Sequence, residues 1–202
     1  MKRLCWSHDD DPLGQTADFV AAASEVGLVI AEFDGGGDGS ALYWTALEPW
    51  TRSRAVTVAV VEGSVASPAL DLALCSDLVS LLPSARLCLA RGPGAPAPGV
   101  IWALGRAGRR ALARGLLSTV DLAAADAVDL GVAHELIRDR SDLSFPRGAS
   151  LTAATTARDL MRSGVPGGSG LALELAAFRF LFATGDPEEG ARAFLEKREP
   201  SF

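Results

Sequence analysis

The segment 60–77 holds the residue types most able to do chemistry in this chain, and it reads VVEGSVASPALDLALCSD. A β-branched run ends in small residues, after which the apolar spacing becomes typical of a helix. Such a strand–turn–helix unit presents backbone N–H groups to an anion or to a polarised carbonyl. Within it, the Asp71 carboxylate is a candidate general base, and Ser64 and Ser67 are candidate ligand-binding hydroxyls. Asp71 also suits a first helical turn, and small hydroxyls also suit a tight turn.

Pro68 stands where this turn becomes the helix. Proline has no backbone N–H, so this position cannot donate a hydrogen bond to an oxyanion. Proline is also favoured in the first turn of a helix, where that N–H is unpaired anyway. The two interpretations are compatible.

Candidate binding residues also lie outside this segment. Gly36, Gly37 and Asp38 belong to a glycine-rich stretch that could cradle a phosphate, although it lacks the spacing of nucleotide-binding loops and is also typical of a plain turn. Arg91 precedes a Pro/Gly-rich stretch and could hold a carboxylate or phosphate. His134 is a candidate general base, or a structural histidine at the edge of a strand.

Hydrophobic periodicity predicts the elements that position these residues. Strands are expected at 3–8, 28–33, 55–61, 79–82, 86–90 and 132–137, with a loop at 34–40. Helices are expected at 16–26, 41–50, 69–74, 100–104, 109–117, after an N-cap at Asp121, and at 150–163, 171–183 and 186–197. The alternation predicts a mostly parallel α/β sheet over 1–148, followed by a helical segment over 149–202.

Composition excludes several classes of protein. The net charge is −6, with 19 basic against 25 acidic residues, which argues against a nucleic-acid partner. The three cysteines are widely spaced and form no Cys-x-x-Cys pair, so we expect no metal site and reduced thiols in a cytoplasmic protein. We expect no membrane association, because no charge-free stretch is long enough to span a bilayer.

The segment 60–77 resembles the central motif of the crotonase (enoyl-CoA hydratase/isomerase) superfamily, Asn-Gly-x-Ala-x-Gly-Gly-Gly-x-Glu-Leu-Ala-x-x-x-Asp. Gly63, Leu72, Ala73 and Asp77 match this motif. The stretches 108–137 and 182–200 resemble two further runs of the family, in the same order. The resemblance implies a crotonase-like (ClpP/crotonase) α/β fold, a spiral of ββα units with a shortened N-terminal third and a C-terminal helical region.

The departures from the family motif bear on activity. Ser67, Pro68 and Ala69 replace the three glycines, and Pro68 replaces the glycine whose N–H the resemblance makes an oxyanion donor. The second donor would come from the loop that here contains Gly36, Gly37 and Asp38. One hydratase glutamate falls on Asp71. The other falls near Ala90 or Arg91, where no acid stands, so ordinary hydration is not expected.

Two functions remain open. The first is an enzyme that dehydrates or isomerises an acyl-thioester or polyketide-like intermediate of secondary metabolism, with CoA or a carrier protein as the substrate's handle and no other cofactor. The second is a non-catalytic accessory subunit for a polyketide synthase or another crotonase. The short first third and the stretches 68–72 and 98–104 are similar to the crotonase-type accessory protein of dihydroxyphenylglycine biosynthesis, which assists a type III polyketide synthase.

The resemblance also implies a homotrimer or a dimer of trimers, with the C-terminal helices at the subunit interface. Apolar residues in these helices agree with packing between subunits, and equally with a monomer core. They are Leu171, Leu175, Phe178, Phe180, Leu181, Phe182 and Phe194.

Overall fold

The computed structural model describes residues 1–7, 11–25, 27–37, 44–89, 98–108, 110–111, 121–143, 150–163 and 168–202. The chain divides into two compact units, Met1–Leu143 and Ser144–Phe202. The first unit contains the sheet and the second is helical.

The sheet of the first unit is centred on β3 (Val56–Val65), the longest strand. Neighbouring strands pair in the order β1-β2-β3-β4-β7, all parallel. The short strand β5 pairs with the end of β3 in parallel and with β6 antiparallel. The other strands are β1 (Lys2–Cys5), β2 (Leu28–Gly36), β4 (Leu78–Leu81), β5 (Arg86–Leu87), β6 (Leu122–Ala123) and β7 (Glu135–Leu136).

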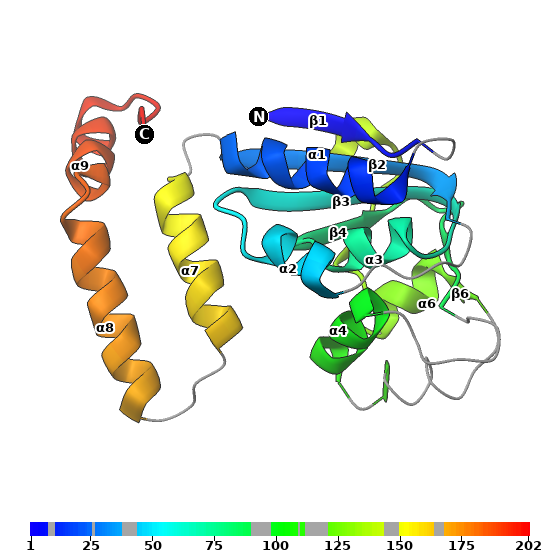
Figure 1. Cartoon of the computed structure of the whole chain (residues 1–202). Coiled ribbons are helices and arrows are strands. Elements are labelled where there is room, and N and C mark those ends of the chain that lie inside the picture. Colours follow the sequence, from blue (N-terminus) through cyan, green and yellow to red (C-terminus); the bar gives the residue numbers. More distant parts are fainter. Residues whose placement is uncertain are drawn as a thin grey trace. The chain divides into compact units, whose positions relative to one another are not determined.

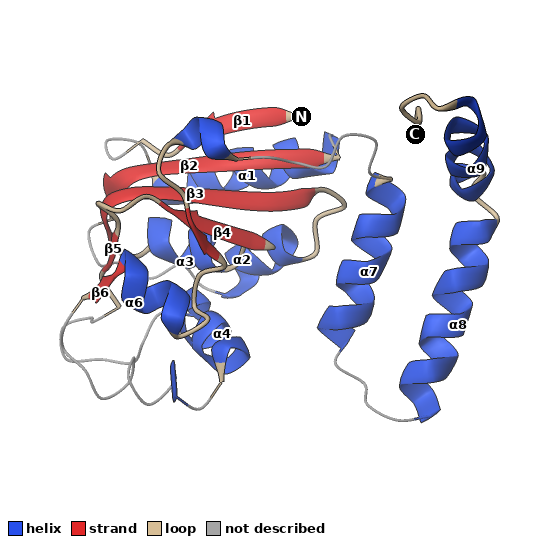
Figure 2. Ribbon diagram, turned by 180° about the vertical axis from the view of Figure 1, so that it is seen from behind, coloured by secondary structure: helices blue, strands red, loops and turns tan. Residues whose placement is uncertain are grey.

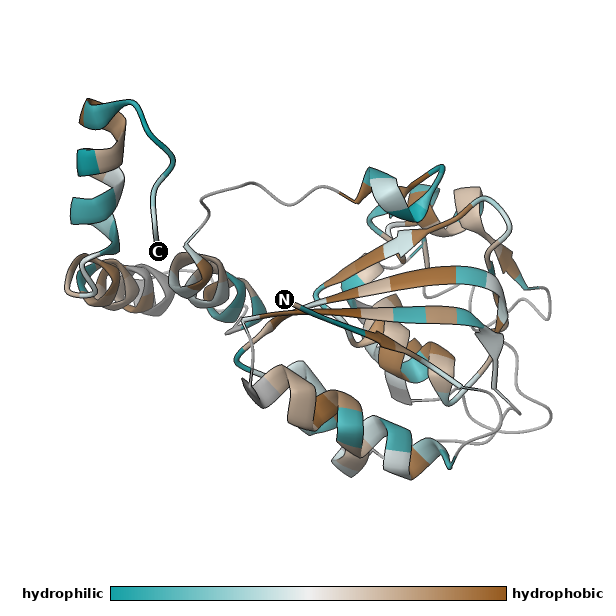
Figure 3. Cartoon of the chain, turned by 90° about the horizontal axis from the view of Figure 1, so that it is seen from above, coloured by the Kyte–Doolittle hydropathy of each residue, from teal (hydrophilic) through white to brown (hydrophobic). Residues whose placement is uncertain are grey.

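Helices cover the sheet because its strands are apolar on both faces, as is usual for parallel sheets. The helices of this unit are α1 (Pro12–Glu25), α2 (Trp44–Thr51), α3 (Ala69–Leu74), α4 (Pro98–Ala107) and α6 (Ala124–Asp129). Figures 1 and 2, seen from opposite sides, place α1, α2 and α3 on one face of the sheet. Figure 3 shows apolar residues running along the strands beneath them.

Aromatic side chains form the centre of the core on that face. The ring of Phe19 in α1 lies 6.1 Å from that of Phe33 in β2 and 5.9 Å from that of Trp50 in α2. Trp6 packs on both Phe19 and Phe33 at 6.0 Å. These contacts join the first two helices to the strand that leads into the glycine-rich stretch.

On the opposite face of the sheet, one arginine forms ion pairs with acidic side chains of β2 and β3. Arg140, in the 3-10 turn η1 (Arg140–Asp142), donates to Glu32 at 3.0 Å, to Glu62 at 2.8 Å and to Asp34. Asp34 and Glu62 each immediately precede a glycine at the end of its strand. Arg140 therefore ties β2 to β3 just before their positive-φ glycines, Gly35 and Gly63.

The second unit consists of α7 (Leu151–Ser163), α8 (Gly168–Phe182) and α9 (Asp186–Glu196). Ser150 accepts a hydrogen bond from the Ala153 N–H at the start of α7 and donates one to Asp186 at the start of α9. A bidentate contact with Arg198 lowers the pKa of Glu189 to about 2. Within the described ranges, no helix combines the length and apolar character needed to cross a membrane.

The structure corrects several expected element boundaries. Pro98 and Gly99 lie inside α4, because a proline that begins a helix loses no hydrogen bond. Asp121 does not cap α6, since the intervening residues pair with β5 and Ala123 takes the cap position. Strand β2 continues through Gly36 with a bulge after Asp34, where a loop was predicted. Most of the helix predicted at 109–117 lies outside the described residues.

Candidate functional site

The end of β2 packs directly against the turn between β3 and α3. Gly36 pairs with Val65, and the Ala66 N–H donates to the Gly36 carbonyl at 2.7 Å. A Cβ at Gly37 would overlap the Ala66 carbonyl and lie 2.7 Å from the Ser67 carbonyl oxygen. Only glycine fits so close an approach, so the glycine-rich stretch and the strand–turn–helix unit form one junction.

Backbone conformation gives a second reason for glycine at this junction. Gly35, Gly36 and Gly37 have φ values of 88°, 108° and 94°, and Gly63 on β3 has 67°. These left-handed values disfavour any residue with a Cβ. The glycine run thus forms the irregular, bulged end of β2 rather than a separate loop.

Helix α3 begins at Ala69, directly after Pro68. The Leu70 N–H donates to the Ala66 carbonyl at 2.9 Å, and the Leu72 N–H to the Pro68 carbonyl at 3.2 Å. In the part of the chain that the structure describes, neither the Gly37 N–H nor the Ala69 N–H has a hydrogen-bond acceptor. The junction therefore keeps two backbone donors despite the proline.

Asp71 is fully buried on α3 and faces the start of α4. Its Oδ1 accepts a hydrogen bond from the Gly99 N–H at 2.9 Å. A Cβ at Gly99 would lie 2.8 Å from the Asp71 carbonyl carbon, so the two helices touch backbone to backbone here. The carboxylate satisfies an N–H at a helix N-terminus, which gives Asp71 a structural role whatever it does in chemistry.

The structure brings together Gly36, Gly37, Ser67, Pro68 and Ala69 from the predicted site, with Asp71 in the first turn of the same helix. Ser67 is buried, whereas Ser64 is exposed on the end of β3 beside β5.

Two predicted binding residues, Asp38 and Arg91, lie outside the described residues, as does Ala90. Among the described residues, no group of three or more His, Cys, Asp or Glu side chains could hold a metal ion.

Sequence reasoning missed two residues that shape this site. Gly99 supplies the N–H that binds Asp71, and the only signal was a Pro-Gly pair before an apolar run. Arg140 lies far along the chain from the strand ends that it holds, and nothing local distinguished it from any exposed arginine.

The backbone and the side chain of His134 both form hydrogen bonds with Val79 of β4. Its backbone N–H donates to the Val79 carbonyl, and its Nδ1 accepts the Val79 N–H, both at 2.9 Å. These bonds hold the segment that leads into β7 against β4, in line with the structural interpretation of this histidine.

Comparison with known proteins identifies the fold. No protein-family model matches the chain, and a search of curated proteins gives no match. Solved structures described as enoyl-CoA hydratases or isomerases superpose over nearly the whole chain. A Mycobacterium abscessus structure has a TM-score of 0.77 at 21% identity, covering 99% of this chain and 94% of its own.

Two further structures agree with the first. An enoyl-CoA hydratase from Shewanella pealeana has a TM-score of 0.77 at 19% identity, with 99% of this chain and 91% of its own covered. An enoyl-CoA hydratase/isomerase from Marinobacter aquaeolei has a TM-score of 0.75 at 23% identity, covering 98% of this chain and 94% of its own. The predicted α/β crotonase fold is confirmed.

Proposed function

We propose that this chain is a divergent crotonase-superfamily protein that binds an acyl thioester and polarises its carbonyl with backbone N–H groups of Gly37 and Ala69. The close packing of Gly37 on the Ala66–Ser67 backbone carries this proposal. It brings a donor from the end of β2 beside the start of α3, and both donors lack an acceptor among the described residues. Fixed donors of this kind stabilise the negative charge that develops on a thioester oxygen.

In this proposal Ala69 takes the part that Pro68 cannot play. Pro68 has no N–H, and the next residue along the helix offers one at the same junction. Ser67, buried beside it, is the candidate hydroxyl. The substrate's handle is CoA or a carrier protein, and no other cofactor is required.

The reaction class follows from the carboxylates. Asp71 is the candidate base, and no acid stands at Ala90 or Arg91 to complete a hydratase pair. A single carboxylate with an oxyanion site suits proton transfer next to a thioester, as in isomerisation or dehydration of a polyketide-like intermediate. We place this activity in cytoplasmic secondary metabolism.

A second candidate is a non-catalytic accessory subunit for a biosynthetic enzyme such as a type III polyketide synthase. Two observations favour it. Pro68 removes one donor, and the buried Asp71 carboxylate is bound to the Gly99 N–H. A fold that had lost its chemistry while keeping its shape would retain such structural contacts.

Titration calorimetry tests the enzyme proposal with acetyl-CoA, crotonyl-CoA and free CoA. We expect saturable binding of the acyl-CoAs and weaker binding of free CoA. Pro68→Ala restores an N–H to the junction and should tighten acyl-CoA binding. If neither the wild type nor Pro68→Ala binds acyl-CoA at millimolar concentration, the proposed thioester site is wrong. The accessory role would then be tested by adding the protein to a purified type III polyketide synthase.

Asp71→Asn separates the two roles of Asp71. Asparagine keeps an oxygen for the Gly99 N–H, whereas Asp71→Ala leaves that N–H unsatisfied at a cost of about 1–3 kcal/mol. If Asp71 is the base, both variants lose turnover, and only the alanine variant loses stability in urea. Full turnover by Asp71→Asn would leave Asp71 with the structural role alone.

A further inference from the structure

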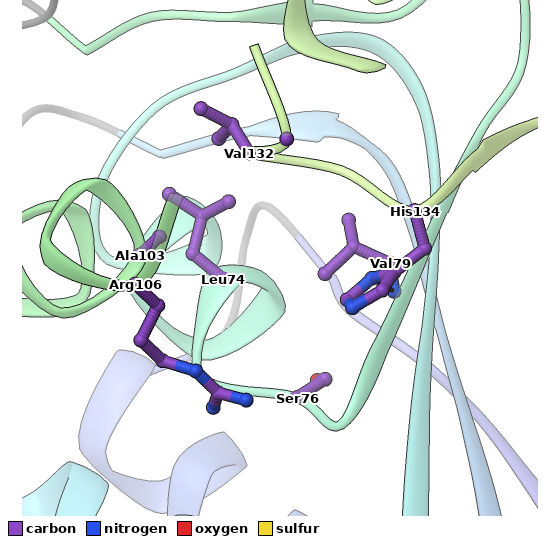
Figure 4. Close-up of a pocket in the computed structure, with 8 residues that line it drawn as sticks. Leu74, Ser76, Val79, Ala103, Arg106, Val132 and His134 are labelled. Carbon is purple, nitrogen blue, oxygen red and sulfur yellow. Dashed lines mark hydrogen bonds between the residues drawn. The ribbon is translucent and has the colours of Figure 1, made fainter. Parts of the chain in front are cut away.

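A separate cavity of about 160 Å³ opens at the other end of α3, away from the junction with Gly37. Leu74, Val79 and Val132 contribute apolar wall, while Ser76, Arg106 and His134 contribute polar groups (Figure 4). The three polar side chains come from the end of α3, from α4 and from the segment before β7. The proposed thioester site uses none of them.

The contacts of His134 identify which ring nitrogen can donate a hydrogen bond into this cavity. Nδ1 of His134 accepts the Val79 N–H, so in the neutral ring the proton lies on Nε2. Partial desolvation of its ring lowers the pKa of His134 below its usual value, and the positive charge of Arg106 lowers it further. The ring is therefore neutral near pH 7, with its Nε2–H as the one remaining donor.

Arg106 supplies the positive charge. Its guanidinium lies 5.4 Å from the centre of the Trp102 ring, which restricts its position. Within the described residues Arg106 makes no ion pair, whereas Arg140 binds three carboxylates. Figure 4 shows the Arg106 guanidinium and the His134 ring extending toward the same space beside Ser76.

Ser76 is buried and offers an acceptor, not a donor. Its hydroxyl donates to the Leu72 carbonyl at 3.2 Å and accepts the Trp50 Nε1–H at 3.2 Å. One lone pair is left, which suits a ligand that carries a hydroxyl.

The carboxylates nearest to His134 already bind protein groups. Asp77 accepts from the Thr57 N–H and hydroxyl, and Glu135 accepts from Ser80. Their negative charge limits the affinity of this cavity for an anion but takes no donor from it.

We propose that this cavity binds a small oxyanion that carries a hydroxyl, such as hydrogen phosphate or a short 2-hydroxycarboxylate. Arg106 binds two of its oxygens, His134 Nε2–H donates to one of them, and Ser76 accepts its hydroxyl. The cavity, of about 160 Å³, has room for an anion of this size.

The test measures the thermal midpoint and amide NMR shifts of the full chain against sodium phosphate, lactate and acetate, with sodium chloride at equal ionic strength as reference. We expect saturable responses to phosphate or lactate at the amides near Ser76 and His134, with acetate weaker because it has no hydroxyl. Arg106→Met should weaken binding by about tenfold or more, as expected for a charge-assisted pair. His134→Asn keeps the acceptor for Val79 and should weaken binding as well.

Arg86→Met is the matched control, since Arg86 is exposed on β5, away from this cavity, and it should bind as the wild type does. A response to phosphate alone or to lactate alone identifies which anion the cavity takes. Responses no larger than that to chloride, or equal responses in wild type and Arg106→Met, would overturn the proposal. Acyl-CoA binding is measured separately, so the two sites succeed or fail independently.

Discussion

Gly37 makes a close backbone approach at the junction between β2 and α3. Its φ of 94° is unfavourable for other residues, and the Ala66–Ser67 backbone leaves no room for a Cβ. Gly108 has nearly the same φ, 97°, but a Cβ there would meet nothing within 4 Å. Comparing alanine substitutions at these two glycines therefore distinguishes the cost of an unfavourable φ from the cost of steric overlap.

Gly37→Ala should destabilise the protein more than Gly108→Ala does. We expect Gly108→Ala to cost about 1–2 kcal/mol for the strained φ alone. Gly37→Ala adds the overlap with two carbonyl groups and should exceed about 3 kcal/mol. Urea unfolding of both variants measures the difference, and equal losses would mean that β2 and the α3 turn do not touch at Gly37.

At the scale of elements, β4 holds its neighbours on both sides by polar contacts with side chains. Asp77, just before β4, accepts the Thr57 N–H of β3, and His134, just before β7, accepts the Val79 N–H. The second contact requires an unprotonated Nδ1. The pairing of β7 with β4 is therefore coupled to the protonation of one imidazole.

The free energy of unfolding should decrease as the pH is lowered, because His134 then becomes protonated. Because the folded pKa of His134 lies below 6.5, the unfolded chain takes up the proton first as the pH drops. This contribution is complete above pH 6.5 and is lost as the pH falls through the folded pKa. His134→Asn keeps an acceptor for Val79 and does not titrate, so its urea midpoint should change less between about pH 7 and 5. Identical pH profiles for the two proteins would contradict this coupling.

At the scale of the whole molecule, the helical unit leaves several large apolar side chains exposed, and exposed apolar patches often mark interaction surfaces. Phe178, Phe180 and Phe182 on α8 are 56%, 55% and 61% exposed. The rings of Phe178 and Phe182 lie 4.4 Å apart and form one apolar pair. We propose that this surface joins subunits into a homotrimer or hexamer, the role expected for 149–202.

Light scattering of the purified chain tests this assembly. We expect a mass three or six times 21.0 kDa for the wild type, and a single-chain mass for the double variant Phe178→Glu, Phe182→Glu. Ile101→Glu changes a half-exposed apolar residue of α4 in the other unit and should leave the mass unchanged. A wild type of single-chain mass would contradict the proposed assembly.

The local features of this protein could be predicted from its sequence. The β-branched run of β3, the small residues after it and the apolar spacing of α3 predicted the central unit, with a helix beginning at Ala69 as the structure confirms. The missing N–H at Pro68 is a property of its covalent structure and needs no fold. The alternation of strands and helices predicted the parallel sheet.

Contacts between residues far apart in the chain were decided only by the tertiary structure. Such contacts produce no repeating pattern in the sequence, because each depends on where two separate elements meet. Examples are Asp71 with Gly99, Gly37 with Ser67, and Arg140 with Asp34. The tautomer of His134 likewise depends on an N–H from another strand. Short-range spacing determines which element forms, whereas its partners follow from how the core packs, and that information is spread over the whole chain.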